Sequence, residues 1–438
     1  MKITKQIITR RELLNGIAAT SFLSVTGLAK AQYSNATLPE SSHTQTAFQI
    51  ARDENFWKEV ANHYEKTVGI TNLEHGYWGK MAKPVQQHYL SATSMVNAQN
   101  SFYARKEYDA DYQISVKRVA DALGVNEDEI VLTRNATESI HNLIRQYRDL
   151  KQGDSVLFAD LDYPSFKTTM RWLKKSTGAN TIQLNLPTLA NQKQLLKLYI
   201  EAFDNNPKLK LMLLTHVSNQ HGLVLPIKQI STEARKRGID IICDNAQSWG
   251  LIDYKINDLD VDMVGFNLHK WIGTPLGVGA LYIKRGSLHK IAPYPGDKDP
   301  DNTDISKRVH VATSNFASVI SIPAALDFHQ AIGGKNKEAR LRYLRSLWTN
   351  KAKSLPNIEI LGGADEESWT GMASFRLRGQ TSIEQANQLQ QRLEKEFGVF
   401  TVIRTGLSSG ACVRITPQVF NTPEDIEKLL SAITKISS

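Results

Sequence analysis

The sequence has 438 residues, of which 41% are hydrophobic and 22% are charged. These values are ordinary for a globular protein of two or three domains, and they exclude a disordered tail or a miniprotein. Two cysteines, Cys243 and Cys412, exclude a disulfide framework and a Cys₄ zinc site, so we expect no metal site, and a formal charge of +9 without a clustered basic stretch gives no reason to expect a nucleic-acid partner.

Residues 1–31 have the pattern of a secretory signal. Four basic residues precede an apolar run over residues 16–28, and a small-x-small cleavage pattern ends at Ala31. The run is too short and too weakly apolar for a membrane-spanning helix. Arg10 and Arg11 resemble the paired arginines of the twin-arginine signal, which exports proteins already folded. We therefore expect the twin-arginine machinery as a partner and a periplasmic location; the alternative is a charged N-terminus before a buried helix. Removing the signal takes away five bases and one acid and leaves a net charge of +5.

An N-terminal arm is predicted over residues 32–75. Its first part, residues 32–52, is polar and rich in Ser, Thr and Gln, so we expect little core there.

A large domain is predicted over residues 76–330. Short apolar, β-branched runs alternate there with amphipathic stretches, which indicates βα units and a mostly parallel sheet of seven strands in an α/β fold. The predicted strands are residues 130–132, 155–158, 181–184, 211–214, 239–242, 263–266 and 279–283.

A smaller α+β domain is predicted over residues 331–438. A long helix over residues 320–351, broken at Gly333-Gly334, leads into it. The elements that follow alternate less regularly than in the large domain. They are strands 358–361, 373–377 and 412–416 and helices 382–397 and 423–436.

Polar residues directly after the predicted strands are candidates for a site, because ligands bind beyond the carboxyl ends of parallel strands. The turn after the first strand contains Asn135, Ala136 and Thr137. Its backbone N–H groups and the Thr137 hydroxyl can bind a phosphate at the positive end of the next helix. The alternative is a plain N-cap by Asn135 or Thr137.

Asp244 and Lys270 each follow a strand of the expected sheet core. A carboxylate at a buried strand end requires a partner, such as the cationic ring nitrogen of a cofactor, although a helix cap is the alternative. Lys270 is flanked by apolar and aromatic residues, which is compatible with a depressed pKa and Schiff-base chemistry. Taken alone, Lys270 would more simply be a surface lysine. The Schiff-base interpretation is favoured only because the phosphate turn and Asp244 accompany it.

Together these motifs resemble the class V aminotransferase family of fold-type I pyridoxal-phosphate enzymes, over about residues 65–436. The resemblance implies pyridoxal 5′-phosphate as cofactor, with Lys270 as the Schiff-base lysine and Asp244 paired with the pyridine nitrogen. It places the other cofactor-binding residues as follows: the phosphate turn at Asn135, Ala136 and Thr137; Tyr163 stacked on the ring, in place of the histidine of desulfurases; Asn219 and Gln247 beside the phenolic oxygen; His269 on the phosphate, with Asn267 in place of a hydroxyl residue; and Thr313 reaching the phosphate of the neighbouring subunit. A homodimer with shared active sites is therefore expected.

The same resemblance implies the substrate contacts and the reaction class. Arg414 would hold a substrate carboxylate, with Arg404 and Tyr77 as further contacts, and Lys270 would move the Cα proton. The stretch Asn72–Gly79 is most similar to the isopenicillin N epimerase-like branch, which contains more than one reaction type.

Four interpretations of the function therefore stay open. An aminotransferase-like reaction on an amino acid or peptide-derived substrate, as in siderophore tailoring, fits a location outside the cytoplasm, and an epimerase is the alternative. Cysteine desulfuration is disfavoured because the loop over residues 407–411 lacks a cysteine and Cys412 lies within a strand. A non-catalytic relative is disfavoured because Lys270, Asp244 and Arg414 are all retained.

Overall fold

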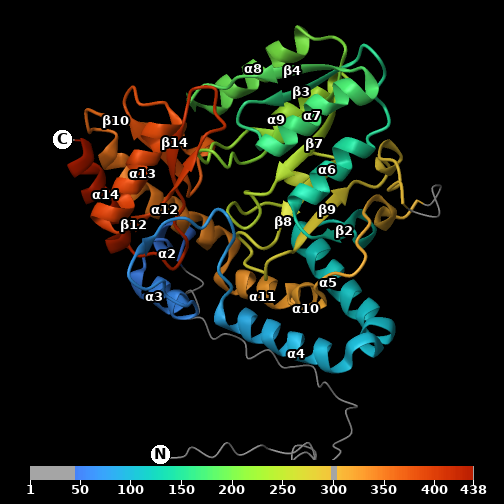
Figure 1. The fold of residues 1–438 in the computed structure, drawn as a ribbon, viewed down its shortest axis with the longest axis horizontal. Coiled ribbons are helices and arrows are strands. Elements are labelled where there is room, and N and C mark those ends of the chain that lie inside the picture. Colours follow the sequence, from blue (N-terminus) through green and yellow to red (C-terminus); the bar gives the residue numbers. More distant parts are fainter. Residues whose placement is uncertain (1–44, 297–302, 438) are drawn as a thin grey trace, which may run out of the picture. The chain divides into compact units, whose positions relative to one another are not determined.

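The computed structural model describes residues 45–296 and 303–437, which belong to one compact unit within Thr37–Ser438 (Figure 1). The predicted signal over residues 1–31 and the first part of the predicted arm lie outside the described residues.

A seven-stranded sheet forms the larger part of the fold, in the order β2-β9-β8-β7-β6-β3-β4. Strand β9 is antiparallel to both of its neighbours, and the other four pairings are parallel. The predicted mostly parallel seven-stranded sheet is therefore confirmed. Its strands are β2 (Ile130–Thr133), β3 (Ser155–Ala159), β4 (Asn180–Leu184), β6 (Leu209–Thr215), β7 (Asp240–Asn245), β8 (Met263–Asn267) and β9 (Gly279–Ile283).

Helices cover this sheet, so the strands β2, β3, β8 and β9 are buried along their whole length. Burial on both faces explains why these strands are continuous apolar runs rather than alternating ones. Helix α6 inserts Ile140, Leu143 and Ile144 into the core, at the spacing of one helical face, and packs against β8 and β9. The helices of this region are α6 (Ala136–Gln146), α7 (Pro164–Thr177), α8 (Gln192–Asp204) and α9 (Ile227–Lys236).

A second sheet of five strands has the order β13-β14-β11-β10-β5. It is antiparallel except for the pairing of β10 with β5. Its own core contains Trp348, Phe375 and Val413. The elements are β5 (Leu189–Ala190), β10 (Ile358–Gly363), β11 (Ala373–Leu377), β13 (Val402–Arg404), β14 (Cys412–Ile415), α12 (Gly334–Ala352), α13 (Ile383–Phe397) and α14 (Pro423–Ser437). Because β5 comes from the earlier part of the chain, the boundary at residue 330 stays a prediction.

The N-terminal segment is more ordered than its composition predicts. Helices α2 (Ala47–Ile50) and α3 (Glu54–Asn62) form there, and Ile50 and Ala51 are only 3% and 1% exposed. The expectation of little core up to residue 52 is therefore wrong for this part. Thr46 and Gln49 form a capping box that starts the helical turn, and Arg340 of α12 donates a hydrogen bond to the Ala51 carbonyl oxygen at 3.0 Å.

Two short strands add a second contact between the N-terminal segment and the C-terminal part of the chain. Strand β1 (Thr71–Asn72) pairs in parallel with β12 (Val399–Phe400), so the N-terminal segment is paired with the C-terminal part of the chain.

A group of helices below the large sheet was predicted only in part. Figure 1 shows the long helix α4 (Lys83–Lys106) beside α5 (Tyr108–Leu123), α10 (Phe316–Ile320) and α11 (Ile322–Ile332), and residue contacts join α4 to all three. The helix predicted over residues 320–351 is present as α11 and α12, which meet at the predicted break at Gly333, whereas α4, α5 and α10 were not predicted individually. Within the described ranges, no helix is both long enough and apolar enough to cross a membrane. Short 3₁₀ turns complete the fold: Glu127–Glu129, Ile256–Asp258, Leu288–Lys290, Ile305–Arg308 and Glu366–Ser368.

Gly279 tests how tightly the start of α6 packs on the sheet. A Cβ atom at Gly279 would lie 2.6 Å from Asn135 Cα and 2.7 Å from the Phe266 carbonyl oxygen, which are both backbone atoms that have no room to move. We therefore expect Gly279→Ala to lower the free energy of unfolding by about 1–3 kcal/mol, measured by chemical denaturation. Gly296→Ala is the control, because its nearest atoms lie at an ordinary 3.5 Å, and its effect should stay within about 0.5 kcal/mol. Equal effects of the two substitutions would contradict the packing argument.

Candidate active site

One cavity of about 390 Å³ gathers the predicted site residues. It lies at the carboxyl ends of β2, β6, β7 and β8, where the parallel strands finish at the same sheet edge. All of the predicted residues except Ala136 and Thr313 line it. They are Tyr77, Asn135, Thr137, Tyr163, Asn219, Asp244, Gln247, Asn267, His269, Lys270, Arg404 and Arg414.

Asp244 lies near the end of β7, level with Gly265 on the neighbouring strand β8. The Ala246 N–H donates to its Oδ1 at 2.9 Å, and no other hydrogen bond to this carboxylate is found within the described chain. Burial raises the pKa of Asp244 to about 6, against smaller opposing effects of the Ala246 hydrogen bond and Lys270. A carboxylate in this position stabilises a cation or a proton donor that binds next to it in the cavity.

Lys270 follows β8 and lines the same cavity. Burial lowers its pKa to about 8, and the arginines Arg404 and Arg414 lower it further, while Asp244 raises it. A lysine with this pKa is partly neutral at physiological pH, so its amine can act as a nucleophile or as a base.

The start of α6 forms the phosphate end of the cavity. Asn135 is the N-cap, and its Oδ1 accepts the Glu138 N–H at 2.8 Å, so the predicted alternative of a plain cap also describes what this side chain does. Ala136 is buried, and its N–H donates to Asn267 Oδ1 at 2.8 Å, so this N–H already has a partner. The Thr137 N–H and hydroxyl have no partner in the described chain and lie where the helix dipole favours an anion.

His269 lies beside Lys270 with a fixed tautomer. Its Nδ1 is 2.9 Å from the Val278 carbonyl oxygen, which can only accept, so Nδ1 carries the proton. Burial and the charge of Lys270 lower its pKa to about 4, which leaves the ring neutral and Nε2 unprotonated. A phosphate at Nε2 would reverse this preference, because an anion stabilises the imidazolium form.

The segment over residues 76–79 closes one side of the cavity through backbone contacts. The Gly79 N–H donates to the His269 carbonyl oxygen at 2.7 Å, and a Cβ at Gly79 would lie 1.7 Å from the Lys270 carbonyl oxygen. The Gln247 amide donates to the Gly76 carbonyl oxygen at 2.9 Å and accepts from Trp271 Nε1 at 2.9 Å. Glycine is therefore required where the segment lies on the Lys270 loop.

Glu74 was not among the predicted site residues. Its carboxylate accepts two hydrogen bonds from Arg414 Nη2, at 2.7 and 2.9 Å, and lies 3.7 Å from Arg404. No local pattern marks this pair, since 340 residues separate its members.

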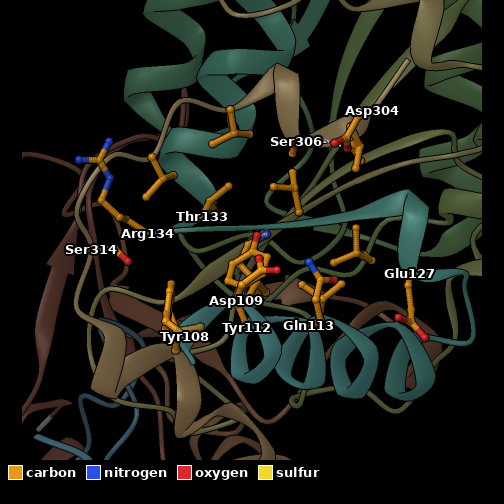
Figure 2. Close-up of a pocket in the computed structure, with 18 of the residues that line it drawn as sticks. Tyr108, Asp109, Tyr112, Gln113, Glu127, Thr133, Arg134, Asp304, Ser306 and Ser314 are labelled. Carbon is orange, nitrogen blue, oxygen red and sulfur yellow. Dashed lines mark hydrogen bonds between the residues drawn. The ribbon is translucent and has the colours of Figure 1, made fainter. Parts of the chain in front are cut away.

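Thr313 does not reach the cavity of its own chain. It is exposed, and its neighbours Ala312 and Ser314 line a second cavity of about 670 Å³ between α5, β2 and residues 304–314. Figure 2 shows Tyr108, Asp109 and Tyr112 of α5 in this second cavity. None of the predicted site residues lines it, so the contact of Thr313 with a neighbouring subunit stays a prediction.

Both thiols lie away from the cavity wall. Cys243 and Cys412 are fully buried, and burial raises the pKa of Cys412 to about 11. A thiol of this kind stays protonated and is a poor nucleophile at neutral pH.

A half-buried lysine and a buried aspartate at neighbouring strand ends, with an anion site at a helix start, are the arrangement that a fold-type I enzyme needs to bind pyridoxal phosphate. The family model described as aminotransferase class-V matches residues 81–429, and the chain belongs to this family.

Curated relatives of two activities match most of the chain. A cysteine desulfurase of Haloferax volcanii is 26% identical over 392 residues, which cover 83% of this chain and 84% of the relative. An isopenicillin N epimerase of Amycolatopsis lactamdurans is 22% identical over 399 residues, which cover 87% of this chain and 98% of the relative. The chain is therefore similar to both and is assigned to neither.

Solved structures show the same fold. The cysteine desulfurase CsdA of Escherichia coli has a TM-score of 0.72 at 20% identity, covering 86% of this chain and 98% of that one. A C-DES mutant with glycine covalently linked to its PLP cofactor has a TM-score of 0.73 at 21% identity, covering 85% and 98%.

Pyridoxal 5′-phosphate is the cofactor of this family, and the cavity fits it. Its volume lies within the range for small ligands. The donors at Thr137 lie at the positive end of α6, which suits a phosphate, and Asp244 suits a protonated ring nitrogen. The chain is therefore a pyridoxal-phosphate-dependent enzyme of the class V aminotransferase family.

The buried Asp244 makes the cofactor-free protein less stable as pH rises. Its folded pKa of about 6 lies above the usual value of 3.8, so the folded state binds the extra proton between these values and loses stability as pH rises through them. We expect Asp244→Asn to stabilise the cofactor-free protein more at pH 8 than at pH 4, with a difference on the order of 3 kcal/mol, at about 1.4 kcal/mol per pKa unit. Denaturation of both proteins at the two pH values measures it. An effect of Asp244→Asn that does not change with pH would contradict the buried-carboxylate assignment.

Proposed function

We propose that this enzyme acts at the amino group and Cα of an amino acid or peptide-derived substrate outside the cytoplasm, in an aminotransferase-like reaction. The observation that carries the proposal is the placement of Lys270 and Asp244 in one cavity with a pair of arginines. Both buried thiols argue against the desulfurase alternative, because sulfur transfer to a protein cysteine requires an accessible thiolate.

Each residue has a role that follows from its position. Pyridoxal phosphate supplies, when bound, an electron sink for a carbanion at Cα. Thr137 and His269 would hold the phosphate, and Asp244 would keep a proton on the pyridine nitrogen. The Lys270 amine would hold the cofactor through its aldehyde group and would take or return the Cα proton, for which its pKa of about 8 is suitable. One arginine of the pair would orient a substrate carboxylate so that one bond at Cα faces the lysine.

Epimerisation is a second candidate function. The isopenicillin N epimerase of Amycolatopsis lactamdurans matches over 98% of its own length, and the chemistry at Cα begins with the same proton transfer. The two reactions differ in where the proton returns, which the residues of this chain do not by themselves determine.

Substitutions at Lys270 and Asp244 separate the two central roles. Lys270→Ala should abolish the adduct that borohydride traps between lysine and cofactor, while the fold survives. Asp244→Ala should keep that adduct and slow solvent-deuterium exchange at Cα by at least about 100-fold, each factor of ten being about 1.4 kcal/mol of barrier. Mass spectrometry reads both results. An adduct on another lysine would contradict the role of Lys270, and unchanged exchange in Asp244→Ala would contradict the role of Asp244.

The fate of the exchanged proton decides between the two candidates. Loss of optical activity without an oxo product favours epimerisation. Conversion of the cofactor to its amine form favours transamination.

A homodimer with shared sites is part of the proposal, because Thr313 lies outside the cavity of its own chain. We expect sedimentation at micromolar concentration to give the mass of a dimer. We expect Thr313→Ala to weaken cofactor binding while the protein still sediments as a dimer. A fully active monomer would refute the shared site.

Export by the twin-arginine pathway is proposed from Arg10 and Arg11. Replacing both with lysine should retain the full chain in the cytoplasm of a bacterial host, whereas Lys5→Arg, the matched control, should not. Unchanged periplasmic recovery of the double variant would contradict export by this route.

A further inference from the structure

Arg414, the predicted carboxylate contact, already binds a carboxylate of its own chain. It is fully buried, and its Nη2 donates to both oxygens of Glu74, at 2.7 and 2.9 Å. Its Nη1 donates to the Asn219 carbonyl oxygen at 2.7 Å. The charge of this guanidinium is therefore neutralised by a two-point contact before any substrate arrives.

Glu74 is held firmly in this position. It is only 8% exposed at its side chain, accepts from the Thr416 hydroxyl at 3.1 Å and donates its backbone N–H to Asn72 Oδ1 at 2.9 Å. Burial alone would raise the pKa of Glu74, but Arg414, Arg404 and Thr416 together hold it below its usual value. Glu74 is therefore an anion at neutral pH, and displacing it would leave a buried charge without its partner.

Arg404 keeps more of its donors free than Arg414, in which both terminal nitrogens have partners and the buried Nε has none. It lines the cavity with its side chain 21% exposed, and the nearest Glu74 oxygen is 3.7 Å away, beyond hydrogen-bond distance. Within the described residues its hydrogen bonding is limited to a long contact from Nη1 to the Ile403 carbonyl oxygen, at 3.4 Å, and its buried Nε has no partner.

We propose that Arg404, rather than Arg414, binds the substrate carboxylate, and that Glu74 determines this by occupying Arg414. The inference rests on the proposed function and specifies which arginine of the cavity recognises a substrate amine that carries a carboxylate.

Two oxyamine probes test the proposal on the cofactor-loaded enzyme. Aminooxyacetate carries a carboxylate and O-methylhydroxylamine does not, and both form an oxime with the cofactor aldehyde and release the Lys270 amine. The absorbance of the cofactor gives a rate constant for each, and their ratio measures carboxylate recognition without depending on the natural substrate.

Arg404→Met should slow the reaction with aminooxyacetate roughly 10- to 100-fold, the value of a lost charge-assisted hydrogen bond. The reaction with O-methylhydroxylamine should stay within about twofold, which a general loss of structure would not allow. Glu74→Gln should speed the reaction with aminooxyacetate several-fold, because it frees the charge of Arg414; a slower reaction would contradict the role of Glu74.

The double variant E74M/R414M removes both members of the buried pair, since removal of one would leave the other charged and unpartnered. It should retain the preference for aminooxyacetate. E359M/R376M is the matched control, because it removes another Arg–Glu pair, joined at 2.8 Å, whose arginine lies in the same sheet as Arg414.

Selectivity that survives Arg404→Met, or that is lost in E74M/R414M but not in the control, would overturn the proposal. Equal rates of the wild type with both probes would overturn this inference and leave the proposed function standing. A wild type without a cofactor band, or without reaction with either probe, would overturn both.

Discussion

Burial of Lys270 and Asp244 in one cavity is the constraint on which the rest of the site depends. Neither charge is stable alone in a poorly hydrated position, and burial moves the pKa of each toward neutrality. Each charge favours the other, and both side chains need parallel, adjacent strands to end at the same sheet edge. The strands β7 and β8 provide that arrangement, so the sheet order is a condition for the chemistry and not only for the fold.

The cavity is closed on one side by residues 74–79, which belong to the core of neither sheet. Within residues 74–79, Gly79 contacts the loop that carries Lys270, the Gly76 carbonyl oxygen accepts from Gln247 just after β7, and Glu74 contacts Arg414 of the second sheet. Glycine is needed at both positions for different reasons: a Cβ at Gly79 would lie 1.7 Å from the Lys270 carbonyl oxygen, and a Cβ at Gly76 would lie 2.5 Å from Arg414 Nη2.

Strands and strand-end residues were predictable because a buried parallel sheet requires continuous apolar runs, and the polar residue after each run has to face the ligand edge. Asp244 and Lys270 are both of this type. Helix α4 was not predicted because only Val85, Ala92 and Tyr103 of its 24 residues are buried, which leaves no apolar stripe to recognise. Glu74 was missed for a different reason: its partner Arg414 lies 340 residues away, and neither residue carries a local mark of the other.

The separation of 340 residues between Glu74 and Arg414 also has a consequence for the folding of the chain. The Thr416 N–H donates to the Leu73 carbonyl oxygen at 2.8 Å, and the His75 N–H donates to the Thr416 carbonyl oxygen at 3.2 Å, so the wall beside Glu74 is fixed by a strand that the ribosome delivers near the end of synthesis. Contacts between such distant residues form late, because the loop between them has to be closed first. A nascent chain that stops before residue 412 contains every strand of the large sheet and still lacks both Arg414 and the Thr416 contacts that hold the segment beside Glu74.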